Sequence, residues 1–190
     1  GAGNTLIFRQ DGGRHGDNTD GYGFLANLRQ AAPDWVPASG PAAIFGAGGA
    51  ARAVIVALLD AGVPELRLAN RTRPRAEALQ REFGARLTVR DWARPSDMLT
   101  GARTVVNTTS LGMDGQPPFP VSLGTLEPEA LVTDLVYTPL DTLLLQQARR
   151  RGCRTVDGLG MLLHQAVPGF ERWFGQRPEV DDETRRAVLR

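Results

Sequence analysis

A glycine-rich turn between an apolar run and a helix-like stretch constrains the fold of this chain more than any other segment. Residues 42–45 are apolar, and Gly46, Gly48 and Ala51 follow them in a G-x-G-x-x-A pattern. In such a turn the first glycine permits a tight bend, the second lets the backbone approach a pyrophosphate, and the third small residue allows close packing of helix on strand. N–H groups at the helix start bind phosphate. The alternative is a glycine-rich turn without a ligand. We favour a dinucleotide site made by Gly46, Ala47, Gly48, Gly49 and Ala50.

Short apolar runs alternate with helix-like stretches along the rest of the chain. Strands are predicted at 4–8, 42–45, 65–69, 86–89, 104–106, 131–135 and 154–156. Helices are predicted from after Asp20 to about Ala31 and at 50–60, 74–83, 140–151, 159–174 and 182–190, whereas 91–101 is unclear. Residues 33–41 form a proline-containing linker. This alternation predicts an α/β fold, a Rossmann-like, doubly wound and mostly parallel sheet of about six strands.

The residues after the second strand of this unit favour NADP over NAD. An NAD site usually has Asp or Glu there to accept hydrogen bonds from the ribose. Here Asn70 takes that position, and Arg71, Thr72 and Arg75 follow it. Without a carboxylate nothing repels a 2′-phosphate, which two arginines can chelate and a hydroxyl can hydrogen-bond. A solvated basic loop is the alternative. We predict that these four residues bind NADP.

Polar residues also follow the strand predicted at 104–106. Thr108 and Ser110 lie there, and in a doubly wound sheet this strand flanks the crevice that opens at the switch point. Hydroxyl groups at that place suit a nicotinamide or its ribose. Asn, Thr and Ser also stabilise turns, which is the alternative interpretation. We include Thr108 and Ser110 among the predicted cofactor-binding residues.

Composition excludes several classes of protein. The 190 residues are 42% apolar and carry a net charge of +1, so no overall field attracts nucleic acid or an anionic membrane. No apolar run approaches the ~20 residues of a membrane span, and no secretory signal is apparent. The single cysteine, Cys153, is typical of a reducing compartment. We therefore predict a cytoplasmic protein, with no nucleic-acid, membrane or metal partner. The chain contains no lysine that could act as an acid or base.

Seven segments occur in an order that resembles the shikimate dehydrogenase family. They are 4–6, 16–21, 46–50, 70–72, 107–110, 134–139 and 157–162. The N-T-D-G and D-G-L-G-M-L sequences among them are far more specific than the glycine-rich turn. The resemblance covers nearly the whole chain. It implies NADP-dependent reduction of 3-dehydroshikimate to shikimate, in the pathway to chorismate and the aromatic amino acids.

The resemblance also implies roles for individual residues. Asn4 matches an asparagine that binds a substrate hydroxyl, and Asp20 matches the aspartate that pairs with a catalytic lysine. Tyr137 and Gln165 match residues that reach the substrate ring. Positions that line the nicotinamide end of the cofactor correspond to Leu135 and Gly158, and Met161 is a further predicted cofactor-binding residue. Ordinary alternatives remain for each: residues 18–20 as a helix N-cap, Tyr137 as a partly buried aromatic residue and Gln165 as a solvated one.

The chain departs from the family at its beginning. A substrate domain of about one hundred or more residues, with the catalytic lysine, has no counterpart in the sequence. The resemblance implies that residues 1–22 are a remnant of that domain and its hinge, that 23–175 form the NADP-binding domain and that 176–190 add a C-terminal helix. We expect the 190-residue chain alone to be inactive as an enzyme. We also expect it either to associate with itself or to need the family's substrate domain.

Two further functions stay open at this point. One is a relative acting on quinate or an aminoshikimate, and the other is an NADP-binding module without catalysis, because the catalytic lysine is absent. The first interpretation, an NADP-dependent oxidoreductase acting on a small-molecule substrate, accounts for most of the motifs.

Overall fold

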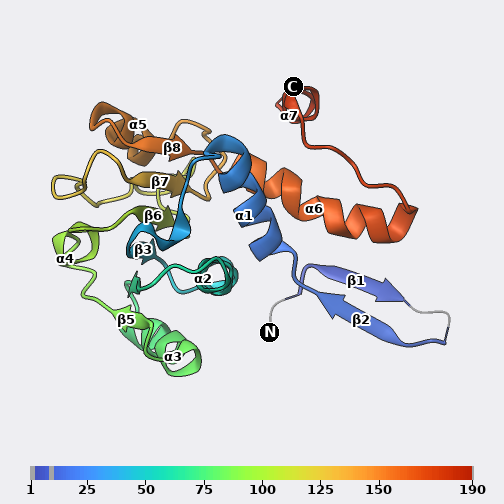
Figure 1. The fold of residues 1–190 in the computed structure, drawn as a ribbon, viewed down its shortest axis with the longest axis horizontal. Helices are drawn as coiled ribbons and strands as arrows, with labels where there is room; N and C mark the ends of the chain where they lie inside the picture. Colours follow the sequence, from blue (N-terminus) through green and yellow to red (C-terminus); the bar gives the residue numbers. More distant parts are fainter. Residues whose placement is uncertain (1–2, 9–10, 190) are drawn as a thin grey trace.

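Residues 3–8 and 11–189 are described by a computed structural model. The larger sheet consists of β3 (Ala42–Phe45), β4 (Leu66–Ala69), β5 (Leu87–Val89), β6 (Thr104–Asn107), β7 (Leu131–Asp134) and β8 (Arg154–Val156). Its strand order is β5-β4-β3-β6-β7-β8, and all neighbours are parallel (Figure 1). The predicted doubly wound α/β fold with about six parallel strands is confirmed.

Helices cover both faces of this sheet. The core on one face includes residues of α1 (Asp20–Ala31), α2 (Gly49–Asp60), α3 (Arg73–Phe83) and α6 (Leu159–Phe174). The core on the other face includes residues of α4 (Ser96–Leu99) and α5 (Leu143–Arg150). Alternation along β3 places Ile44 in the first core and Phe45 in the second. Every residue of β3 is buried, as expected of a central parallel strand.

Two glycines let α1 and α6 pack closely, and this packing positions the start of α1. A Cβ atom on Gly23 would lie 2.7 Å from Cβ of Gln165, and one on Gly160 would overlap the side chain of Asn27. The Asn27 amide donates to the carbonyl of Asp157 at 2.8 Å. The two helices therefore lie side by side (Figure 1).

A two-stranded antiparallel hairpin projects from the sheet domain. It consists of β1 (Thr5–Phe8) and β2 (Arg14–Asp17) (Figure 1). Arg172 of α6 forms an ion pair with Asp17, and the Trp173 indole donates to the carbonyl of Leu6 at 3.2 Å. These contacts fix the hairpin against the last turns of α6. Strand β2 is absent from the sequence prediction, because its residues Arg-His-Gly-Asp lack any apolar alternation.

Element boundaries differ from the prediction in a few places. Helix α5 begins at Leu143 rather than at 140, because the Thr142 hydroxyl caps it by accepting from Leu145 N–H at 3.4 Å. The unclear segment 91–101 contains the short helix α4. The C-terminal helix α7 spans Asp182–Val188. Gln10, and Arg190 at the end of the last predicted helix, lie outside the described residues.

The predicted domain boundary after residue 22 falls within the first turn of α1. The division of the chain into domains stays a prediction. None of the helices in the described ranges combines the length and apolar character needed to cross a membrane.

Candidate functional site: a cavity at the glycine-rich turn and a polar cluster

The glycine-rich turn lies at the carboxyl end of β3, where β6 runs alongside. Gly46 has φ of +111°, and a Cβ atom there would lie 2.5 Å from Oγ1 of Thr108. Only glycine suits this position, because the backbone is left-handed and Thr108 occupies the space. At Gly48 the backbone is extended and a Cβ atom would meet nothing within 4 Å. The space above Gly48 is thus open to a ligand, as the dinucleotide prediction requires.

Asn70 braces this turn from the end of β4. Its Oδ1 accepts from Ala47 N–H at 3.1 Å, and its Nδ2 donates to the carbonyl of Thr72 at 2.8 Å. The side-chain amide therefore connects the glycine turn to the segment that carries Arg71. Contact between Asn70 and a cofactor stays a prediction, and the structure adds this bracing role.

A cavity of about 480 Å³ opens at this edge of the sheet. Its lining includes the predicted residues Gly46, Ala47, Gly48, Asn70, Arg71, Arg75, Thr108 and Ser110. Trp92, Thr109, Leu111, Gln116 and Pro117 also line it and were missed. Thr109 and Leu111 are neighbours of predicted residues, whereas Trp92 lies in the segment to which the sequence assigned no structure. The structure thus gathers the predicted turn, the predicted arginines and the residues after β6 in one cavity.

The electrostatics of the cavity favour an anion. Neither Arg71 nor Arg75 is ion-paired within the part of the chain that the structure describes, whereas Arg73 between them bonds Glu77 at 2.8 Å. Helix α2 begins at Gly49 with no acidic residue in its first turn, so its positive end is left uncompensated. A helix N-terminus and two guanidinium groups without an ion-pair partner in the described ranges therefore adjoin the same cavity.

Thr72, Gly49 and Ala50 are predicted cofactor residues that do not line this cavity. Thr72 is the N-cap residue of α3, and Gly49 and Ala50 form the first turn of α2. They lie directly beside cavity residues in the chain, and their contact with a cofactor stays a prediction.

A second group of predicted residues lies where β7 ends and α6 begins. A Cβ atom on Gly158 would overlap the carbonyl of Leu135, so glycine allows these two backbones to approach. The Asp157 side chain, just before the Gly158 N-cap of α6, accepts from Leu159 N–H at 3.0 Å. Met161 is only 8% exposed and belongs to the core beneath. The structure thus places Leu135 and Gly158 side by side, as a common wall requires.

A buried carboxylate, Asp134, organises the end of β7. It accepts from Asn107 Nδ2 at 2.9 Å, from Val136 N–H at 3.1 Å and from Thr142 Oγ1 at 2.8 Å. Burial raises the pKa of Asp134, and these three hydrogen bonds oppose the rise. The network ties the end of β6 to the end of β7, and so supports both the Thr108 side and the Leu135 side of the crevice.

The predicted substrate residues Asn4 and Asp20 are in direct contact. Asn4 Nδ2 donates to Asp20 Oδ1 at 2.7 Å, and Asn18 Nδ2 donates to Asp20 Oδ2 at 3.3 Å. Thr19, which lies between Asn18 and Asp20 in the N-T-D-G sequence, donates its hydroxyl to the backbone carbonyl of Gln165 at 2.7 Å. Asn4 and Asp20 therefore form a polar cluster at the start of α1, which Thr19 links to the backbone of Gln165.

The N-cap interpretation of residues 18–20 is only partly correct. Thr19 is the N-cap residue of α1 but makes no capping hydrogen bond with its side chain. Tyr137 follows β7 in a loop and is 44% exposed, so its side chain is open to contact with a ligand.

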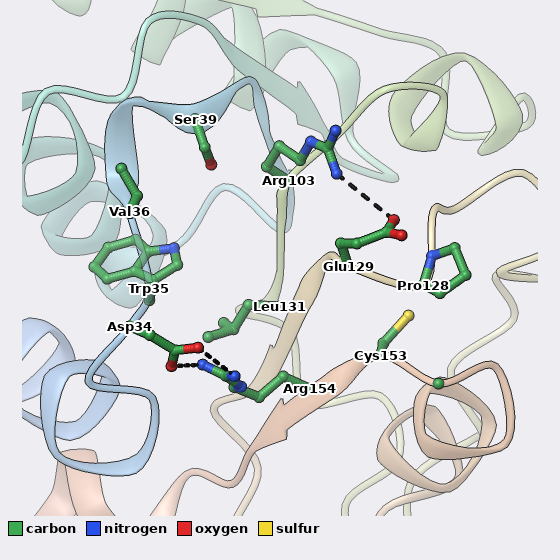
Figure 2. Close-up of a pocket in the computed structure, with 11 residues that line it drawn as sticks. Asp34, Trp35, Val36, Ser39, Arg103, Pro128, Glu129, Leu131, Cys153 and Arg154 are labelled. Atoms are coloured by element: carbon green, nitrogen blue, oxygen red, sulfur yellow. Dashed lines mark hydrogen bonds and ion pairs between the residues drawn. The ribbon is translucent and has the colours of Figure 1, made fainter.

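A further cavity, of about 790 Å³, lies at the opposite edge of the sheet. Figure 2 shows it between Trp35 on one side and Cys153 on the other. Both of its arginines are ion-paired, Arg103 with Glu129 at 3.7 Å and Arg154 with Asp34. Burial raises the pKa of Cys153, so its thiol stays protonated. This cavity contains none of the predicted site residues.

Three comparisons with known proteins agree on the family. Residues 158–189 match the family model described as the shikimate 5′-dehydrogenase C-terminal domain. A shikimate dehydrogenase (NADP(+)) of Paracoccus denitrificans is 69% identical over 189 residues, which are 100% of this chain and 67% of that protein.

Among solved structures, quinate dehydrogenase from Corynebacterium glutamicum in complex with NAD superposes with a TM-score of 0.90 at 33% identity, covering 99% of this chain and 67% of that one. Shikimate 5-dehydrogenase from Thermus thermophilus in complex with NADP(H) and shikimate gives 0.80 at 38% identity, covering 94% and 64%. With a relative of 69% identity matched over its full length and two thirds of the relative's, this chain belongs to the shikimate dehydrogenase family.

Proposed function

We propose that this chain binds NADP and serves the NADPH-dependent reduction of 3-dehydroshikimate to shikimate. The proposal is carried by Arg71 and Arg75, which have no ion-pair partner among the described residues and lie in the wall of the cavity made by the glycine-rich turn. The family assignment supports it, because relatives at 69% and 68% identity are NADP-dependent shikimate dehydrogenases.

The cofactor, when bound, supplies a hydride for a ring ketone. The residues of this chain would hold it at two ends: Gly48 and the first turn of α2 at the pyrophosphate, and Arg71 with Arg75 at the 2′-phosphate. Leu135 and Gly158 would form the wall behind the nicotinamide. Together these contacts would place the reacting carbon close to the polar cluster at the start of α1.

Within that cluster Asp20 would face the substrate oxygen that gains a proton. Asn4 and Asn18 each donate to one of its carboxylate oxygens, which fixes the orientation of the carboxylate. An acid–base pair needs a cationic partner for this group. The chain has no lysine, so its own residues supply only the aspartate of such a pair.

Quinate oxidation with NAD is the second candidate, because the quinate dehydrogenase structure superposes with a TM-score of 0.90. Asn70 argues against it. A carboxylate at that position would accept hydrogen bonds from the ribose of NAD. Here the Asn70 amide instead bonds the backbone of Ala47 and Thr72, and the positive charge of Arg71 and Arg75 beside it favours a phosphate.

Titration of NADPH and NADH by fluorescence tests the proposal. We expect NADPH to bind at least about tenfold more tightly, since each charge-assisted hydrogen bond contributes about 1.5–3 kcal/mol. Arg71→Ala and Arg75→Ala should each remove most of that preference. Arg73→Ala is the matched control, because Arg73 bonds Glu77 and does not line the cavity. Equal affinities of the parent chain for NADPH and NADH would exclude the NADP assignment.

A further inference from the structure

Trp92 lies in the wall of the nucleotide cavity and has no assigned role. It follows β5, is half-buried and lines the cavity together with Gly46, Arg71 and Arg75. Its ring packs edge-on against Phe45, with centroids 6.0 Å apart and an angle of 80° between the planes. Because Phe45 immediately precedes Gly46 in the chain, this contact anchors the indole beside the glycine-rich turn.

The indole N–H of Trp92 distinguishes it from the other two tryptophans. Trp35 donates to Thr104 Oγ1 at 3.0 Å, and Trp173 donates to the carbonyl of Leu6 at 3.2 Å. Among the residues that the structure describes, Trp92 Nε1 has no acceptor. Trp35 and Trp173 are thus committed to internal contacts. Trp92 instead presents an amphipathic ring edge to solvent or to a ligand.

The chemistry of the cofactor determines what would meet this ring. The 2′-phosphate and the adenine are attached to adjacent carbons of one ribose, so the adenine must lie within a few ångströms of the arginines that hold the phosphate. Trp92 is the one aromatic side chain that lines the cavity in the described part of the chain. Purines stack on aromatic rings, and such stacking strengthens binding roughly 5- to 150-fold per base.

We propose that Trp92 is a cofactor-binding residue whose indole contacts the adenine ring of NADP. This inference rests on the proposed NADP site. The edge contact with Phe45 holds the indole in place before the ligand arrives, so little ordering accompanies binding. Trp92 would therefore contribute to the affinity for NADP and for NAD alike, whereas Arg71 and Arg75 distinguish between them.

Binding of NADPH, NADH and adenosine 2′,5′-bisphosphate to variants of the full 190-residue chain tests this role. Trp92→Ala should weaken all three on the order of tenfold, leaving the ratio of NADPH to NADH affinity unchanged. Trp92→Phe keeps an aromatic ring against Phe45 and should retain most of the affinity. Adenosine 2′,5′-bisphosphate should quench indole fluorescence in the parent chain and in the Trp173→Phe control, but not in Trp92→Phe.

The outcomes separate this inference from the proposed function. If Trp92→Ala binds all three ligands as the parent does, the adenine contact is wrong and the NADP site stands. If Trp92→Ala abolishes only the preference for NADPH, the indole acts through the phosphate clamp and the adenine contact is again wrong. If the parent chain binds neither NADPH nor adenosine 2′,5′-bisphosphate, both proposals fail.

Discussion

Replacing Gly48 by valine separates ligand binding from folding. The backbone of Gly48 is extended, with φ of −97° and ψ of −165°, and a Cβ atom added there would meet no atom within 4 Å. A β-branched residue is well suited to such a conformation, and no neighbour has to move. The folded protein should therefore accept the substitution with little loss of stability.

The same open space is where a pyrophosphate would approach the start of α2. Charge-assisted hydrogen bonds from backbone N–H groups contribute about 1.5–3 kcal/mol each. Losing two of them amounts to about 3–6 kcal/mol, which corresponds to a roughly 10²- to 10⁴-fold weaker binding of NADPH. Gly48→Val should thus bind almost no NADPH at concentrations that half-saturate the parent chain.

Gly46→Ala is the contrasting substitution. Its φ of +111° is strained for any residue with a side chain, and the new methyl group would lie 2.5 Å from Thr108 Oγ1. The backbone cannot easily relax, because Gly46 N–H donates to the carbonyl of Ala69 at 2.8 Å. We expect this variant to lose about 1–3 kcal/mol of unfolding free energy.

Thermal melts followed by circular dichroism, together with NADPH titrations, distinguish the two effects. Gly48→Val should melt as the parent does and fail to bind, whereas Gly46→Ala should melt at a clearly lower temperature. A folded Gly48→Val chain with the parent's NADPH affinity would show that the glycine-rich turn is not the phosphate site. An unfolded Gly48→Val chain would show that the space above Gly48 is needed for folding.

Two further results are expected. Burial lowers the pKa of His164 below its ordinary 6.5. Between pH 6.5 and the lowered pKa the unfolded chain binds a proton at His164 and the folded chain does not, so the unfolding free energy should fall as the pH drops through this range. Thermal melts of His164→Gln should lack that part of the pH dependence. Phe170, Trp173 and Phe174 at the end of α6 are 40%, 55% and 65% exposed, so light scattering should show association that grows with protein concentration, and Phe174→Ser should weaken it.

Local patterns were sufficient to predict the sheet domain. The strands from β3 to β8 are short segments that contain apolar or β-branched residues and are bounded by turn residues, and Gly46 with Gly48 marks the first crossover of a parallel unit. Strand β2 was missed because its pairing depends on the backbone of β1 rather than on its own side chains. Trp92 was missed for a similar reason. Its place in the cavity results from the adjacency of β5, β4 and β3 in the sheet, which no local pattern around Trp92 reveals.

The α1–α6 pair explains how residues far apart in the sequence come to one site. Thr19, at the start of α1, bonds the carbonyl of Gln165 on α6, and Asn27, further along α1, bonds the carbonyl of Asp157 just before α6 begins. Since Gly158 follows Asp157 and meets Leu135, the helix that carries Asp20 is fixed to the wall of the predicted nicotinamide site. The position of Asp20 is therefore set by the sheet domain, through two hydrogen bonds and close helix packing. The hairpin adds Asn4, which then holds the carboxylate in the orientation that a proton-transferring group needs.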